Sequence, residues 1–167
     1  MKKTDVLIAH NKGVYNIKVE GRATFEYGPP LRTLAKNLEN EMFERISVDL
    51  NECTGMDSTF MGLLAMLGLR ARKISAVMEI LNANEANMGL LRGLGLEKLF
   101  KFSVRDSSEI DKDSTWQKAE TQSDKLATAE AVVDAHDTLM DVNPGNIPKF
   151  EKVVDLAKKD LDKLSKK

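Results

Sequence analysis

Two hydroxyls and a carboxylate stand together at one point of the chain, in the run Asp57-Ser58-Thr59. The run follows a short apolar strand pattern over residues 46–50 and leads into a segment that is apolar on nearly every face. This junction predicts an exposed turn at a helix N-terminus, where free N–H groups and the helix dipole favour anions. A phosphate there would add about −1.5 to −2 charge at pH 7. The pattern therefore predicts Ser58 as a phosphate acceptor, with Thr59, one residue further into the helix and less accessible, as the alternative.

A purely structural role for Ser58 is the other interpretation. A serine at a helix start can accept a backbone N–H as the N-cap, a contact worth about 1 kcal/mol. A full capping box requires Glu or Gln at position 61, where this chain has Met61. Capping would explain Ser58 but not the adjacent Asp57, so both interpretations stay open on the pattern alone.

The remaining chemistry-bearing residues form no recognisable site. Cys53 is a possible nucleophile, but no histidine is near it in sequence, and lone thiols at strand ends are usually packing residues. His10 and His136 have no metal-ligand spacing with each other or with Cys53. The glycines match neither a phosphate-binding loop nor a dinucleotide fingerprint. We therefore expect a protein that is not an enzyme and that holds no metal and no cofactor.

Strand and helix patterns alternate through the first two thirds of the chain. Two strand patterns flank Asn11-Lys-Gly13, whose residues suit a tight hairpin turn. The patterns that follow predict a helix from Leu31 with Pro30 at its start, a strand over 46–50, a helix over 59–73, a strand over 77–81, a short helix between Asn84 and Gly93, and a last strand over 99–104. Such alternation predicts an α/β fold with a mixed, mostly parallel sheet and helices packed on it.

The C-terminal third predicts a polar linker or helix start over 107–122, followed by a helical hairpin over 123–167. The stripe of the first helix comprises Leu126, Ala129, Val133, His136 and Met140, and that of the second comprises Ile147, Phe150, Val154, Ala157, Leu161 and Leu164. Asn143-Pro-Gly145 makes the turn between them. So thin a hairpin is not stable alone. The default expectation is docking on its own sheet domain, and the alternative is docking on a second subunit, a homodimer through the C-terminal helices.

Composition excludes several function classes. The 167 residues carry a formal net charge of −1, which argues against a broad electrostatic surface for nucleic acid. A single cysteine excludes an internal disulfide and fits a reducing compartment. The first residues lead straight into a strand pattern, and no segment approaches the roughly 20 apolar residues that span a bilayer. We therefore expect a cytoplasmic protein without nucleic-acid or membrane partners.

Residues 4–104 resemble the STAS domain, the fold of bacterial anti-sigma factor antagonists and of sulphate transporter tails. The resemblance is carried by the strand order and by three short runs, which are Val48-Asp-Leu50, Met56-Asp57-Ser58-Thr59 and Gly62-Leu-Leu64. Further likeness lies in Ala83-Asn84 and Leu94-Gly95-Leu96. It implies a STAS domain over residues 1–106, with the linker and the hairpin outside it.

The resemblance also implies a mechanism, which is partner switching in transcription regulation. In this family the first serine of the Asp-Ser motif takes the phosphate, a role that maps onto Ser58. The implied partners are an anti-sigma factor that is also a serine kinase and a PP2C-type, metal-dependent serine phosphatase, and the ATP belongs to the kinase. The residues expected to form the contact surface around Ser58 are Thr24, Glu26, Thr54, Met56, Asp57 and Phe60.

One departure from the family pattern concerns Phe60, which stands where a glycine is usual. We expect its ring to pack on a partner or to restrict access of a kinase to Ser58. Two other functions stay open: a STAS scaffold or transporter-accessory protein that is not phosphorylated, and a module that binds nucleotides.

Overall fold

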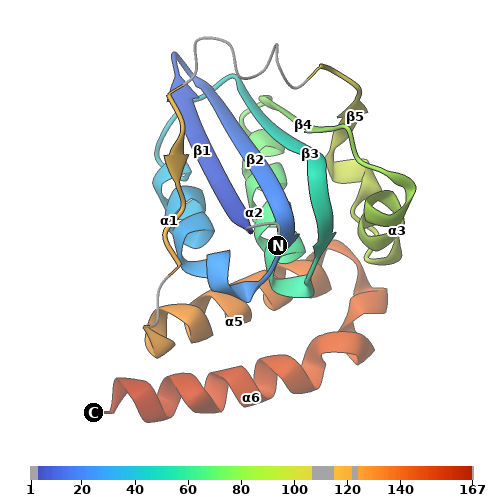
Figure 1. Ribbon diagram of the computed structural model, residues 1–167. Helices are drawn as coiled ribbons and strands as arrows, with labels where there is room; N and C mark the ends of the chain where they lie inside the picture. Colours follow the sequence, from blue (N-terminus) through green and yellow to red (C-terminus); the bar gives the residue numbers. More distant parts are fainter. Residues whose placement is uncertain (1–3, 107–114, 122–123, 167) are drawn as a thin grey trace.

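A mixed sheet with the strand order β5-β4-β3-β2-β1-β6 is the frame of the protein (Figure 1). The computed structural model describes residues 4–106, 115–121 and 124–166. The strands are β1 (Asp5–Asn11), β2 (Val14–Ala23), β3 (Arg45–Met56), β4 (Val77–Leu81), β5 (Lys101–Ser103) and β6 (Gln117–Lys118). Strands β2 to β5 are parallel, and β1 is antiparallel to both of its neighbours. The predicted mixed, mostly parallel sheet is confirmed.

The turn between β1 and β2 has the predicted tight geometry. Lys12 and Gly13 are its two central residues, with φ angles of 48° and 82°. Positive φ at both positions gives the turn the twist that matches two antiparallel strands. This turn fixes the register in which Val6 faces Val19 on the core side of the sheet.

Helices α1 (Gly28–Leu38) and α2 (Ser58–Lys73) cover one face of the sheet (Figure 1). Helix α3 (Glu85–Gly93) packs against β3, and the predicted cap holds because Asn84 accepts the N–H of Asn87 at 2.8 Å. Two short 3₁₀ helices complete the domain, η1 (Phe25–Tyr27) before α1 and η2 (Glu97–Leu99) before β5. Within the described ranges no helix combines the length and apolar character needed to cross a bilayer.

The segment predicted as a linker or helix start contains a strand instead. Gln117 and Lys118 form β6, which pairs with Ile8 and Leu7 of β1. The outer edge of β1 would otherwise present unpaired backbone groups, so a short added strand is favoured there. Residues 107–114 and 122 of the predicted linker lie outside the described residues.

The C-terminal hairpin docks on its own sheet domain, as the default expectation stated. It consists of α5 (Lys125–Val142), the 3₁₀ turn η3 (Pro144–Asn146) and α6 (Ile147–Ser165). Helix α5 lies across the ends of α1 and α2, and α6 packs on α5 from outside (Figure 1).

The predicted stripe on α5 is only partly correct. Val133 and His136 are buried, but Leu126, Ala129 and Met140 are only partly buried, and Ala131, Ala135 and Leu139 are buried in their place. A single stripe fails because α5 is a middle layer that contacts α2 on one side and α6 on the other.

Phe60 identifies the part of α2 that belongs to the core. Its ring is 0% exposed, whereas Phe25, in the neighbouring 3₁₀ helix η1, is 48% exposed. We expect Phe60→Ala to lower the free energy of unfolding by about 3–5 kcal/mol, because the truncation removes apolar contacts and leaves a cavity. Phe25→Ala is the matched control and should change it by about 0.5 kcal/mol or less. Denaturant unfolding measures both, and equal losses would contradict the placement of Phe60.

Candidate functional site at the start of helix α2

The candidate site lies where β2 and β3 end at the same edge of the sheet. Ala23 and Met56 are the last residues of these parallel strands and pair directly with each other. The chain continues from Ala23 into η1 and from Met56 into α2, so both helix starts lie side by side. Ligand sites of open α/β sheets commonly form at this carboxyl edge. Here the edge is covered by α5 (Figure 1).

Asp57, and not Ser58, is the N-cap of α2. Its carboxylate accepts the N–H of Phe60 at 2.9 Å and the N–H of Phe25 at 2.7 Å. One side chain therefore closes the first turn of α2 and ties η1 to it. The prediction that capping explains Ser58 but not Asp57 was wrong, because the cap is one residue earlier and leaves the Ser58 hydroxyl free for another contact.

The Ser58 hydroxyl is paired with a histidine of α5. Its Oγ lies 2.8 Å from Nε2 of His136, whose Nδ1 lies 2.7 Å from the carbonyl oxygen of Val132. A carbonyl can only accept, so Nδ1 carries the proton and Nε2 accepts the hydrogen bond from the Ser58 hydroxyl. Ser58 is half-buried and His136 is 2% exposed. The turn is therefore only partly exposed, and the Ser58 hydroxyl is paired with α5 rather than free in solvent.

Burial keeps His136 in its neutral form. Removal from water lowers the pKa of the imidazole below its ordinary value, which outweighs the hydrogen bond to Val132 and the carboxylates of Asp57 and Asp137, all of which raise it. A neutral ring is the form that can accept the hydrogen bond of Ser58. The docked position of α5 and the protonation state of His136 are thus coupled.

Glycine allows α5 to approach α2 and α1 closely. A Cβ at Gly62 would collide with the backbone carbonyl of Ala135, and a Cβ at Gly28 would lie 3.0 Å from the Cβ of Ala131. Ala131 and Ala135 are both 0% exposed. The helices therefore meet through backbone and small side chains, a contact that tolerates no added methyl at Gly62.

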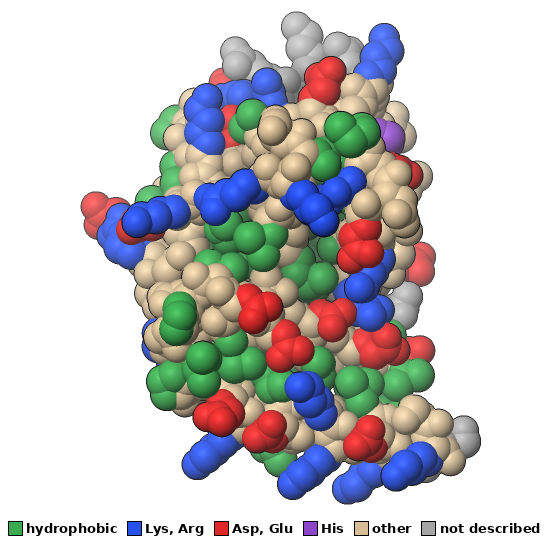
Figure 2. Space-filling view, turned by 180° about the vertical axis from the view of Figure 1, so that it is seen from behind, with side chains coloured by type: hydrophobic (Ala, Val, Ile, Leu, Met, Phe, Trp, Pro, Cys, Tyr) green, Lys and Arg blue, Asp and Glu red, His purple; other side chains and the backbone are tan. Residues whose placement is uncertain are grey.

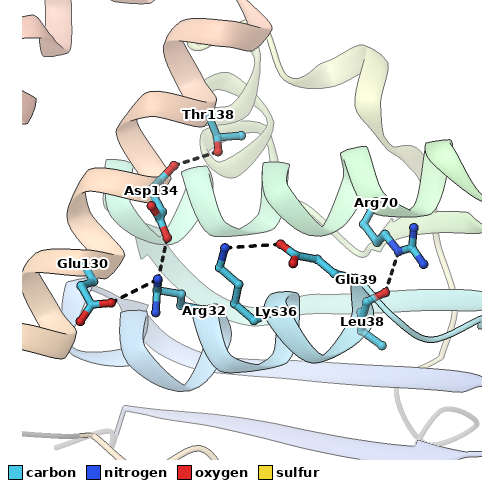
Figure 3. A network of polar contacts seen from close by, with 8 residues as sticks. All are labelled: Arg32, Lys36, Leu38, Glu39, Arg70, Glu130, Asp134 and Thr138. Carbon is cyan, nitrogen blue, oxygen red and sulfur yellow. Dashed lines mark hydrogen bonds and ion pairs between the residues drawn. The ribbon is translucent and has the colours of Figure 1, made fainter.

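Ion pairs at the edge of the contact between α1 and α5 accompany this packing (Figure 3). Arg32 of α1 lies 3.2 Å from Glu130 and 2.6 Å from Asp134, both on α5. These side chains keep between 27% and 35% exposure, so each pair contributes at most about 1 kcal/mol. They determine the orientation of α5 on α1 more than they strengthen its binding to the sheet domain.

The far end of the hairpin is fixed by the turn η3. Asn146 is 0% exposed and donates to the carbonyl oxygens of Leu94 and Leu139 at 3.0 and 2.8 Å. The ammonium of Lys149 donates to the carbonyl oxygen of Gly93 at 3.0 Å. The hairpin is therefore held at both ends, by η3 at the exit of α3 and by His136 at the start of α2.

Of the residues expected to contact a partner, only some are accessible. Thr54 and Glu26 are exposed, and Thr24 is half-buried as the N-cap of η1. Met56 and Phe60 are 4% and 0% exposed, so the expectation that they form a contact surface, or that Phe60 shields Ser58, is wrong. Both point into the core because this part of the chain packs under α5. Thr59, at 4% exposure, is also buried.

Cys53 lies in the core beside this site. It is 3% exposed, and its thiol donates to the carbonyl of Gly55 at 3.3 Å. Burial raises the pKa of the thiol, which disfavours the reactive thiolate. Among the described residues no group of three His, Cys, Asp or Glu side chains is placed to hold a metal ion.

The pair formed by Ser58 and His136 has the spacing of a nucleophile and its base. Such chemistry also needs a cavity for a substrate. The groove of about 700 Å³ between α5 and α6 is lined by Val132 but by neither Ser58 nor His136. The hydrogen bond joins α2 to α5 and so contributes to helix docking. Sequence reasoning did not connect His136 with Ser58; the available signal was a lone polar residue within the apolar stripe of α5.

Comparison with known proteins shows the fold. No family model and no curated protein matches the chain. A solved structure of the anti-sigma factor antagonist SpoIIAA in its unphosphorylated form is similar with a TM-score of 0.50 and 12% identity, covering 66% of this chain and 94% of that one. The Bacillus cell fate determinant SpoIIAA in its phosphorylated form gives a TM-score of 0.49 at 13% identity over 66% and 97% of the chains. SLC26A9 gives 0.44 at 10% identity over 65% and 23%. The chain has the STAS-like α/β fold that the motifs predicted.

The buried His136 predicts a pH dependence of hairpin docking. The pKa of His136 is lowered in the folded chain, so the unfolded chain binds more protons near and below pH 6.5. The contribution of neutral His136 to the free energy of unfolding is therefore present above that pH and is lost as the pH falls through the pKa of the folded chain. We expect the free energy of unfolding to decrease between pH 7.5 and 5.5, as measured by denaturant titration. The His136→Gln variant should lose this component, and the matched His10→Gln variant should retain it. An equal pH dependence in all three proteins would contradict the coupling.

Proposed function

We propose, on the premise that the chain has the STAS fold, that it is a regulatory binding protein acting as an anti-sigma factor antagonist by partner switching, with Ser58 as the site of reversible phosphorylation. The observation that carries the proposal is the position of Ser58, the first residue of α2 directly after the carboxyl edge of β3, in a fold similar to unphosphorylated SpoIIAA. STAS folds are in general regulatory rather than enzymatic.

A phosphate on Ser58 would change this edge of the molecule sharply. Its charge of about −1.5 to −2 would stand beside the Asp57 carboxylate and against the neutral ring of His136, 2.8 Å from the present hydroxyl. The N-terminus of α2 favours the anion, but the anion would replace the hydroxyl that now donates to His136 of α5. Thr59 remains the alternative acceptor, and its burial makes it the weaker one.

The proposed partners are an anti-sigma factor serine kinase and a PP2C-type serine phosphatase. The accessible residues next to Ser58 that would form the contact are Thr24, Glu26 and Thr54, with Phe25 exposed between the first two. A new negative charge at such an interface costs several kcal/mol if the partner presents a carboxylate there, which is enough to release a complex of ordinary affinity.

Substitution of Ser58 tests this function. A panel of purified anti-sigma factor kinases with ATP should add one phosphate to the wild-type chain, as read by intact-mass spectrometry, and none to Ser58→Ala. Ser58→Asp should weaken binding to the same kinase by at least about tenfold, the loss expected for like charges brought together at an interface. The matched controls Thr33→Ala and Thr33→Asp, at an exposed hydroxyl of α1 outside the proposed contact, should behave as wild type in the phosphorylation assay.

Other outcomes of these assays favour the alternatives. Full phosphorylation of Ser58→Ala would move the role to Thr59 or elsewhere. Partner binding that is unchanged in Ser58→Asp would favour an unmodified STAS scaffold or a transporter-accessory protein. Thermal stabilisation by a member of a nucleotide panel, about 2.7 kcal/mol at 100 times the dissociation constant, would favour a nucleotide-binding module.

The C-terminal helices are also the proposed route to a homodimer. Val153 and Leu156 on α6 are 39% and 63% exposed and line the groove between α5 and α6. Figure 2 shows apolar side chains in a band above the charged lower edge that α6 forms. Two α6 helices meeting antiparallel at Leu156 would place Lys152 of one copy beside Asp160 of the other, twice. The same register also places Lys149 beside Lys163, so it is the exposed apolar side chains of Val153 and Leu156 that favour a second copy as the occupant of the groove.

Charge exchange on α6 tests the homodimer. We expect the wild-type chain to show a concentration-dependent dimer in sedimentation equilibrium. Asp160→Lys should shift it towards monomer because two lysines then face each other, and the double variant Lys152→Asp/Asp160→Lys should restore the dimer. A wild-type chain that stays monomeric, or a double variant that behaves like the single one, would contradict this interface.

A further inference from the structure

We infer that the face formed by the start of α2, the start of α1 and the exit of α3 is a helix-binding surface that the chain's own C-terminal hairpin occupies. The hairpin then competes with any partner or modifying enzyme that approaches Ser58. This inference goes beyond the proposed function. It rests on that function only for the identity of the partner or enzyme with which the hairpin competes.

The shape of the contact defines what the surface binds. At Gly62 the surface has no side chain, and the backbone carbonyl of Ala135 occupies the space that a Cβ would take. At Gly28 the neighbour is the Cβ of Ala131, four residues earlier on the same helix. The surface therefore accepts an α-helix that carries small side chains at positions i and i+4, and larger ones would hold the backbones apart.

Polar contacts of three different kinds place the hairpin on this surface in one orientation. They are the hydrogen bond between Ser58 and His136, the ion pairs of Arg32 with α5, and the amide of Asn146 on the carbonyl oxygen of Leu94. They come from α2, α1 and the exit of α3, so the hairpin contacts the whole face at once. As long as these contacts hold, His136 stays hydrogen-bonded to the Ser58 hydroxyl and restricts an approach to it from solvent.

The composition of the contact also makes the hairpin displaceable. The buried residues of α5 that meet α1 and α2 include Ala131 and Ala135, whose side chains remove little apolar area from water. The ion pairs of Arg32 keep about a third of their exposure and are therefore weak. Apart from Leu139, which is fully buried, the hairpin is thus held by many small contributions. A helical partner that keeps small side chains at positions i and i+4 and adds apolar contacts beside them can replace it.

A thiol at position 58 reports whether the hairpin is closed. The helix N-terminus favours the reactive thiolate at position 58, so each rate is measured over a range of pH and divided by the thiolate fraction. In Ser58→Cys the reaction with 5,5′-dithiobis(2-nitrobenzoic acid) should then be at least about tenfold slower than in Thr54→Cys, because only the open form reacts. Adding Gly62→Ala should raise the rate at position 58 about tenfold, since the new methyl group separates α5 from α2 while alanine favours the α2 helix itself. Gly89→Ala is the matched control and should leave the rate unchanged, because a Cβ there meets no atom within 4 Å.

Two internal readouts keep this test decisive. Buried Cys53 does not react with the reagent while the sheet domain is folded, so a reaction at Cys53 would reveal unfolding and not hairpin opening. If Gly62→Ala exposes Cys53, the milder Arg32→Ala variant decides: it should raise the rate at position 58 about threefold, and Arg92→Ala, which breaks an ion pair within the domain, should not.

The inference is overturned if Ser58→Cys reacts as fast as Thr54→Cys in the otherwise unchanged chain. It is equally overturned if Gly62→Ala and Arg32→Ala leave Cys53 unreactive and also leave the reaction rate at position 58 unchanged. The assay uses no kinase, so its success together with an unmodified Ser58 would reject the proposed function while the occupied surface stands.

Discussion

The close approach of α5 to α2 at Gly62 is the constraint on which the site depends. Because the backbone of Ala135 takes the place of a side chain, the next residue, His136, reaches the Ser58 hydroxyl at 2.8 Å. Burial then keeps the imidazole neutral and able to accept that hydrogen bond. Helix packing, the protonation of a histidine and the accessibility of a serine are consequences of one contact.

The sheet domain supplies the rigid side of this contact, and the hairpin supplies the adaptable side. Asp57 caps α2 and binds the N–H of Phe25, while Phe60 anchors the same turn in the core. The hairpin is held by Ala131, Ala135 and Leu139, by partly exposed ion pairs and by the amide of Asn146. A charge added at Ser58 would therefore displace α5 rather than distort the sheet, because the hairpin is held less strongly than the sheet domain and opens at a lower free-energy cost.

Much of the fold could be predicted from the sequence, because local signals were consistent with the tertiary structure. The turn at Lys12-Gly13, the cap at Asn84 and the strand–turn–helix around Ser58 are all set by neighbouring residues. The site itself could not be predicted in full. Ser58 and His136 are 78 residues apart. The direction in which Phe60 points, like the choice between Asp57 and Ser58 as the cap, depends on packing that only the complete fold decides.

Hydrogen exchange of the backbone amides, measured by mass spectrometry, tests the central claim most directly. In the wild-type chain the amides of α5 should be protected, and in Ser58→Asp they should exchange faster while those of β3 keep their protection. Equal protection of α5 in both proteins would contradict the account, because a charge at Ser58 would then coexist with the docked hairpin.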